Sequence, residues 1–169
     1  MRLAEEHTIA FKEEMQEAFL RGFQAYNKDD NEDSNQWQVL PDEDFYQSLR
    51  AEGAEAYEAV DADGQRVGGA IITIDNSTHG GELAFLHVKV GIQSRGIGQA
   101  IWKAIETLHP EVEMWETCTP YFDRRNIHFY INRCGFHAVE FYNERHPDPH
   151  MPEQFNEEDG LFKFEKRMK

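Results

Sequence analysis

The segment from Glu82 to Cys118 constrains the fold more than any other part of the chain. A mostly apolar strand pattern at Glu82–Val90 is followed by a helical pattern at Gly96–Leu108 and by a second strand pattern at Val112–Cys118. This order predicts two parallel strands joined by a right-handed crossover. Both faces of Glu82–Val90 are largely apolar, so we expect this strand to lie centrally in its sheet.

The rest of the chain predicts helices and antiparallel strands around this unit. Apolar residues at helical spacing predict a helix at residues 8–26, and a shorter helix begins at Pro41 and ends at Gly53. The sequence Asp61-Ala62-Asp63-Gly64 predicts a tight turn between strands Glu55–Val60 and Arg66–Ile74. The remaining expected elements are a helix at Tyr121–Arg133 that ends at Gly135, and strands at Phe136–Asn143 and Leu161–Arg167. This order predicts one α+β domain, residues 1–169, with a mixed sheet and helices on its faces.

The composition argues against several classes of protein. The chain has 17 Lys and Arg residues against 32 Asp and Glu residues, a formal net charge of −15, whereas nucleic-acid binding needs a basic surface. No apolar run reaches the ~20 residues of a membrane-spanning helix, and the acidic N-terminus does not resemble a secretory signal. We therefore expect a cytoplasmic protein without membrane contacts, whose two cysteines, Cys118 and Cys134, are reduced. The acidic charge either steers a cationic substrate or serves solubility alone.

The loop between the first parallel strand and its helix is a candidate anion site. Residues 88–99 read VKVGIQSRGIGQ and lead directly into the helix. The first amides of a helix have no internal partner and carry the positive end of its dipole, and glycines allow a phosphate to approach the backbone closely. The segment matches neither GxxxxGK[ST] nor GxGxxG. A tight turn that needs glycine for steric reasons is the alternative interpretation.

Two motifs in this chain resemble those of the GNAT superfamily, the acetyl-CoA-dependent N-acetyltransferases. Gln93-Ser94-Arg95-Gly96-Ile97-Gly98 matches the family motif [QR]-x-x-G-x-[GA], and the segment FYINRCGF at Phe129–Phe136 is similar to the family's second signature, with its Phe-Tyr and Gly-Phe pairs. The order of elements agrees across nearly the whole chain. The resemblance implies a three-layer α+β fold with helices on both faces of a mixed, mostly antiparallel sheet of six to seven strands. That sheet would be splayed between its fourth and fifth strands, here between residues 83–90 and 112–118.

The resemblance also implies acetyl-CoA as cosubstrate, with no metal. The pantetheine arm would pair with a strand backbone and the pyrophosphate would rest on the amides of the glycine loop. Many family members carry an asparagine seven residues before the motif tyrosine, where this chain has Asp123. Either Asp123 caps the helix, or Asn126 takes over the pantetheine contact. The cofactor-binding residues expected from the resemblance are Leu86, His87, Val88, Gln93, Ser94, Arg95, Gly96, Ile97, Gly98, Gln99 and Asn126.

The catalytic candidates follow from the needs of acetyl transfer to an amine. The amine must lose a proton and the departing thiolate must gain one. Tyr130 matches the motif tyrosine that serves as general acid in many family members, and Glu82 lies where some members carry a glutamate base. Glu116, His87 or a water molecule are the alternatives for the base. Cys134 is expected to be a buried structural thiol, and His146 and His150 lie in a proline-rich loop that does not suit a metal site.

We therefore expect an N-acetyltransferase that moves the acetyl group of acetyl-CoA to a primary amine of a small molecule or peptide, by direct attack in a ternary complex. A cationic acceptor would suit the acidic segments at residues 29–44 and 140–159. Exposed strand edges are compatible with a homodimer. The alternative is a non-catalytic sensor or interaction module that binds CoA or acetyl-CoA on the same fold.

Overall fold

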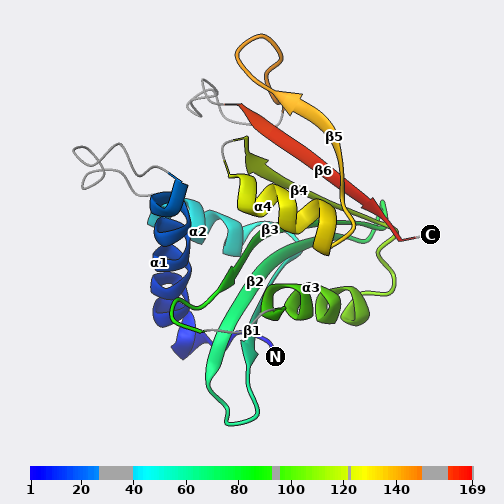
Figure 1. Ribbon diagram of the computed structural model, residues 1–169. Coiled ribbons are helices and arrows are strands. Elements are labelled where there is room, and N and C mark those ends of the chain that lie inside the picture. Colours follow the sequence, from blue (N-terminus) through cyan, green and yellow to red (C-terminus); the bar gives the residue numbers. More distant parts are fainter. Residues whose placement is uncertain (27–39, 93–95, 122, 150–159, 169) are drawn as a thin grey trace.

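A six-stranded sheet forms the centre of the part of the chain that the structure describes (Figure 1). The structure is a computed structural model, and it describes residues 1–26, 40–92, 96–121, 123–149 and 160–168. The strands are β1 (Ala54–Val60), β2 (Arg66–Asp75), β3 (Gly80–Val88), β4 (Met114–Pro120), β5 (His137–Tyr142) and β6 (Leu161–Arg167). The helices are α1 (Thr8–Tyr26), α2 (Asp42–Arg50), α3 (Ile97–Leu108) and α4 (Arg124–His128), with a 3-10 turn at Glu5–His7 and a π-helical turn at Phe129–Arg133.

The sheet is mixed and mostly antiparallel, as predicted. Its strand order is β1-β2-β3-β4-β6-β5. The strands β3 and β4, which are connected through α3, are parallel, and the other neighbouring pairs are antiparallel. The prediction of a central strand followed by a parallel crossover unit is therefore confirmed.

The first three residues extend this sheet beyond β1. The Leu3 amide donates to the Ala56 carbonyl at 2.9 Å, and the Glu58 amide donates to the Met1 carbonyl at 2.9 Å. Residue Arg2 forms an antiparallel bridge with Tyr57. If this short segment is counted as a strand, β3 and β4 become the fourth and fifth strands, between which the splay is expected.

Helices cover both faces of the sheet (Figure 1). The helices α1 and α2 lie on one face, where Phe11 and Phe45 pack against Ile71 of β2. The helix α3 lies on the other face, where Trp102 meets Trp115 of β4 edge-on at 5.0 Å between ring centroids. The sheet therefore separates two apolar cores. In the described part of the chain, no helix is both long enough and apolar enough to span a bilayer.

The helix expected at Tyr121–Arg133 is shorter and less regular than predicted. Asp123 precedes the first residue of α4, and its carboxylate accepts the Asn126 amide at 3.1 Å, which is a side-chain N-cap. The chain then widens into the π-helical turn at Phe129–Arg133. Gly135 ends the helical segment as predicted, and its φ of +83° is the left-handed conformation typical of a glycine at that position.

The boundaries of β3 also differ from the prediction by two residues at each end. The strand begins at Gly80 rather than at Glu82, directly after His79, which has φ +56°. It ends at Val88, three residues before Gly91, which has φ +87°. The turns at both ends therefore require left-handed backbone, which apolar periodicity does not report.

Gly69 allows α1 to lie close to the sheet. A Cβ atom at this position would lie 2.3 Å from a Phe11 ring carbon and 2.5 Å from the Tyr57 carbonyl oxygen. The Tyr57 carbonyl is part of the backbone, so it cannot move aside without disturbing the ladder between β1 and β2. The absence of a side chain at Gly69 is therefore a packing requirement.

We expect Gly69→Ala to destabilise the fold by about 1–3 kcal/mol, the usual cost of forcing extra volume into a packed core. The matched control is Gly22→Ala in α1, where a Cβ atom would meet nothing within 4 Å. That control should be neutral or stabilising, because alanine favours helix more than glycine does. Urea unfolding of the two variants measures both effects, and equal stability of the two would contradict the packing argument.

Candidate active site

The strands β3 and β4 part from each other shortly after they pair. Their parallel register covers only Gly80–Glu82 of β3 and Met114–Glu116 of β4. Figure 1 shows the two strands leaving their common end in different directions. At the point of divergence the Thr117 hydroxyl donates to the Leu83 carbonyl at 2.9 Å. The predicted splay is therefore present at the predicted place in the chain.

A β-bulge in β3 lies beside this point of divergence. Ile71 of β2 faces Phe85, but the next residue, Ile72, faces Leu83, so Ala84 is an extra residue in β3. A bulge bends its strand and increases the local twist. The bulge therefore helps to turn the second half of β3 away from β4.

The glycine loop after β3 delivers the chain into α3. Gly96 is the residue before the helix and has φ +93°, a conformation that favours glycine, and no side chain in the described residues caps the helix there. The helix begins at Ile97, so the amides of its first turn point toward the loop. Gln93, Ser94 and Arg95, which complete the predicted motif, lie outside the described residues.

The start of α3 lies close to the Phe129–Arg133 turn. A Cβ atom on Gly98 would come within 3.1 Å of the Phe129 ring, and the Gln99 side chain donates to the Arg133 carbonyl at 3.0 Å. The two sequence motifs are therefore adjacent in space, and the glycine at position 98 permits this contact.

Tyr130 lies in this turn and is almost fully buried. Its ring lies 5.8 Å from that of Phe136 and 5.9 Å from that of Phe164, centroid to centroid. Burial raises the pKa of Tyr130, and the neighbouring Thr117 side chain acts in the opposite direction. Thr117 is also the residue that contacts Leu83 across the divergence. Tyr130 is therefore a protonated phenol next to the vertex of the opening.

Glu82 and Glu116 lie on the opposite face of the sheet. They are register partners on β3 and β4, and the neighbours Leu83, Trp115 and Thr117 point into the core with α3. Partial burial raises the pKa of Glu82, and the Glu116 and Asp148 carboxylates raise it further. Glu82 is an exposed residue. Its position and its raised pKa suit a group that exchanges protons with a ligand.

The side chains of the other residues singled out in the sequence are less accessible to a ligand in the opening. The His87 ring is buried beneath α1, 5.1 Å from the Phe11 ring centroid, and burial lowers its pKa to about 4. Its side chain therefore does not reach the opening, although its backbone lies on the free part of β3. Cys134 is buried in the core, where burial raises its pKa to about 12, as expected for a structural thiol. The Asp123 carboxylate is used as a helix cap, and Asn126 is half-buried beside it.

Two residues near this site were missed by the sequence analysis. Thr117 lies two residues after Trp115 on β4, so the two side chains share the inward face, and this direction was detectable from the sequence. The contact of Thr117 with Leu83 was not, because it depends on the divergence of the strands. Lys163 on β6 lies 3.3 Å from Glu116, and no local pattern connects residues so distant in sequence.

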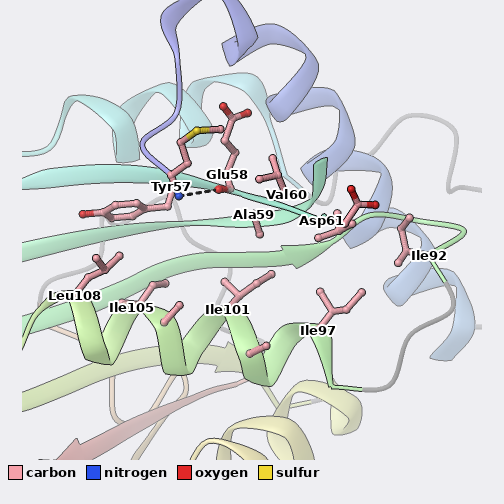
Figure 2. Close-up of a pocket in the computed structure, with 14 residues that line it drawn as sticks. Tyr57, Glu58, Ala59, Val60, Asp61, Ile92, Ile97, Ile101, Ile105 and Leu108 are labelled. Carbon is pink, nitrogen blue, oxygen red and sulfur yellow. Dashed lines mark hydrogen bonds between the residues drawn. The ribbon is translucent and has the colours of Figure 1, made fainter. Parts of the chain in front are cut away.

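A separate apolar groove of about 630 Å³ lies between α3 and β1 (Figure 2). Figure 2 shows Ile97, Ile101 and Ile105 of α3 pointing toward Ala59 and Val60 of β1. None of the residues that line this groove belongs to the opening between β3 and β4. The groove is therefore outside that opening, although Ile97 of the first turn of α3 lines one end of it.

Comparison with known proteins gives the same family as the sequence motifs. The model of the acetyltransferase (GNAT) family matches residues 11–136. The chain is 40% identical to the Bacillus subtilis protein YrkN, over the whole of this chain and 93% of that protein. The chain therefore belongs to the acetyltransferase (GNAT) family.

Solved structures show the same fold at low sequence identity. A Bacillus subtilis acetyltransferase in complex with CoA is 20% identical, with a TM-score of 0.59, and the match covers 76% of this chain and 86% of that one. The spermidine N-acetyltransferase of Vibrio cholerae, in complex with CoA and spermine, is 10% identical, with a TM-score of 0.66, and the match covers 99% of this chain and 93% of that one. These likenesses agree with the splayed mixed sheet described above.

We expect Asp123→Ala to destabilise the fold by about 1 kcal/mol, because the alanine cannot cap α4. Asp123→Asn keeps a capping oxygen and should retain the stability.

Burial raises the pKa of Asp123, so the folded state binds a proton on this carboxyl group more tightly than the unfolded state does. The contribution of this group to stability therefore falls as pH rises from the ordinary aspartate pKa through the raised one, and Asp123→Asn should remove that slope. Thermal unfolding between pH 4 and 7 measures both effects, and equal loss in the two variants would contradict the capping role.

Proposed function

We propose that this protein is an N-acetyltransferase that transfers the acetyl group of acetyl-CoA directly to a primary amine in a ternary complex. The observation that carries this proposal is the arrangement of Tyr130 and Glu82. Tyr130 lies on the α3 side of the sheet and Glu82 on the α1 side, and both lie where β3 and β4 part. An acid and a base on opposite sides of one opening suit a reaction in which two substrates meet within it.

The second half of β3 fits the extended arm of the cosubstrate. After Glu82 no described strand pairs with the β4 side of β3, so the backbone there is available to a ligand. An extended ligand that lies along a free strand edge gains main-chain hydrogen bonds. Backbone groups alternate along a strand and the Lys89 amide donates to Val67 of β2, so Leu86 and Val88 would provide these bonds on either side of His87. The half-buried Asn126 on α4 would face the same arm.

The start of α3 fits the pyrophosphate. Gly96 and Gly98 carry no side chain between a phosphate and the backbone, and the amides of Ile97, Gly98 and Gln99 lie at the positive end of the helix dipole. Gln93, Ser94 and Arg95 would complete the loop around the phosphates.

The two catalytic groups would each move one proton. Glu82 would accept a proton from the acceptor amine, directly or through water, so that the nitrogen lone pair can attack the thioester carbonyl. As the new C–N bond forms and the C–S bond breaks, the Tyr130 hydroxyl would donate its proton to the departing sulfur. The proton that the new amide nitrogen loses would return through water to the Tyr130 oxygen, so the net proton released is the one that Glu82 accepts. Because burial raises the pKa of Tyr130, the phenol carries this proton at neutral pH.

The acceptor would approach from the face of Glu82 and Glu116. The carboxylates there and the net charge of −15 favour a cationic amine. The spermidine acetyltransferase compared above acts on such an amine. A peptide amine is the other class compatible with an open, acidic surface.

We expect Gly96→Asp to abolish acetyl-CoA binding, because it would place a carboxylate where a phosphate should rest. The matched control is Gly64→Asp in the turn between β1 and β2. Gly64 has φ +80° and nothing within 4 Å of its Cβ position, so it imposes the same backbone strain without contact to the site. Isothermal titration of both variants with acetyl-CoA measures the difference. Retained affinity in folded Gly96→Asp would show that the loop is only a turn.

We expect Tyr130→Phe to lower turnover about 10²–10⁴-fold, the usual contribution of a positioned acid. The ring and its contacts with Phe136 and Phe164 are kept, so acetyl-CoA affinity should change little. The rate should be measured in single turnover, where product release does not mask the chemical step. A hydroxyl with a purely structural role would give the reverse result, a stability loss of about 1 kcal/mol with turnover retained.

A further inference from the structure

An ion pair on the neighbouring strands lies beside the proposed base. The register of the parallel ladder places Glu116 directly opposite Glu82. The Lys163 ammonium of β6 lies 3.3 Å from one Glu116 carboxylate oxygen and 3.7 Å from a Glu165 carboxylate oxygen. The residue on β4 that faces Lys163 in the antiparallel ladder is Cys118, two positions beyond Glu116. One face of the sheet therefore carries the Glu82 carboxyl on β3, the Glu116 carboxyl on β4 and the Lys163 ammonium on β6, in that order across the strands.

From this geometry we infer that Glu116 and Lys163 are positioning residues that control how readily Glu82 takes up the proton of the acceptor amine. This inference rests on the proposed function. Glu116 opposes a second negative charge on Glu82, and Lys163 limits that effect by pairing with Glu116. Neither residue is required to touch the substrate.

The charged and titratable groups around Glu82 agree in direction with this role. Partial burial raises the pKa of Glu82 most, Glu116 and Asp148 raise it further, and Lys163 lowers it. Two further groups share this face: the Glu165 carboxylate, which is the register partner of Glu116 and pairs with Lys163, and the Cys118 thiol, whose own pKa is raised to about 12 by burial. The balance between Glu116 and Lys163 is therefore the adjustable part of the electrostatic environment of Glu82.

The chemistry of the reaction explains why such a balance matters. A general base works best when its pKa approaches the operating pH, because it must be ionised and must still bind a proton well. An isolated exposed glutamate is ionised at neutral pH but binds a proton weakly. Glu116 strengthens proton binding by Glu82, and Lys163 acts in the opposite direction.

A purely structural role does not explain the Glu116–Lys163 pair well, because the pair adds little to the stability of the fold. The two side chains are 38% and 24% exposed, and ion pairs of this kind contribute little to the free energy of unfolding. The strands β4 and β6 are already joined by a ladder from Met114 to Pro120. Removal of the pair should therefore leave the fold intact, which makes its effect on Glu82 measurable.

The direct test is a titration of the Glu82 side chain, followed by the ¹³C chemical shift of its carboxyl carbon in the unliganded protein, with Glu82→Gln used to assign the signal. Glu116→Gln should lower the pKa of Glu82, because it removes the opposing charge. Lys163→Met should raise that pKa, because it removes the cation and frees Glu116 to act. The double variant should fall between the two single variants.

The matched control is Lys166→Met. Lys166 lies on the same strand, but its ammonium pairs with Glu106 of α3 at 2.7 Å, in the core on the other face of the sheet. This variant also removes one cation from β6, and it should leave the titration of Glu82 unchanged. The conservative variants Glu116→Asp and Lys163→Arg keep the charges and should restore behaviour close to that of the natural protein.

The pH profile of kcat/KM should follow the titration of Glu82. It can be measured with acetyl-CoA and either spermidine or a peptide that has a free N-terminal alanine. The acid limb should move to lower pH in Glu116→Gln and to higher pH in Lys163→Met. Unchanged titration in both variants, or shifts in the same direction, would overturn the inference. If the natural protein transfers acetyl to neither amine while the opposite shifts are observed, the proposed function fails with these acceptors and the coupling between the three residues stands.

Discussion

The candidate site depends on how short the pairing between β3 and β4 is. Parallel strands usually continue side by side, but here the ladder covers three residues on each strand and then stops. The bulge at Ala84 bends β3, and the Thr117–Leu83 hydrogen bond holds the strands together where they begin to part. As a result, none of the described strands pairs with one side of the second half of β3. We propose that the cosubstrate of this protein binds along that edge.

The same divergence determines which side chains can cooperate. The last paired residues, Glu82 and Glu116, point to the face of α1, whereas Thr117 points to the core, where it neighbours Tyr130. The two faces of a sheet are normally separated by its backbone, and an opening between strands is what would allow the proposed acid on one face and the proposed base on the other to act on the same ligands. The ion pair between Glu116 and Lys163 then lies beside the proposed base, Glu82, because β6 pairs with β4 along its whole length.

Much of this arrangement was predictable from local sequence patterns. The parallel crossover followed from the strand, helix and strand order, and Gly135 and Gly64 have the left-handed φ angles that their positions imply. The two motifs were recognisable because their glycines and aromatic residues reflect steric requirements, such as the contact of Gly98 with Phe129. The π-helical turn was not predictable, because widening a helix by one residue leaves the apolar spacing nearly unchanged. The register of Glu82 with Glu116, and the place of Lys163 beside them, depend on the crossover and on β6, so they required the structure.

Amide hydrogen exchange with and without acetyl-CoA is the most direct test of the claim that the opening between β3 and β4 binds the cosubstrate. We expect acetyl-CoA to slow exchange at the first-turn amides of α3 and at the amides of residues 83–88 that point away from β2. Exchange in β1 should not change. Protection confined to the groove between α3 and β1, or no protection along β3, would contradict the claim.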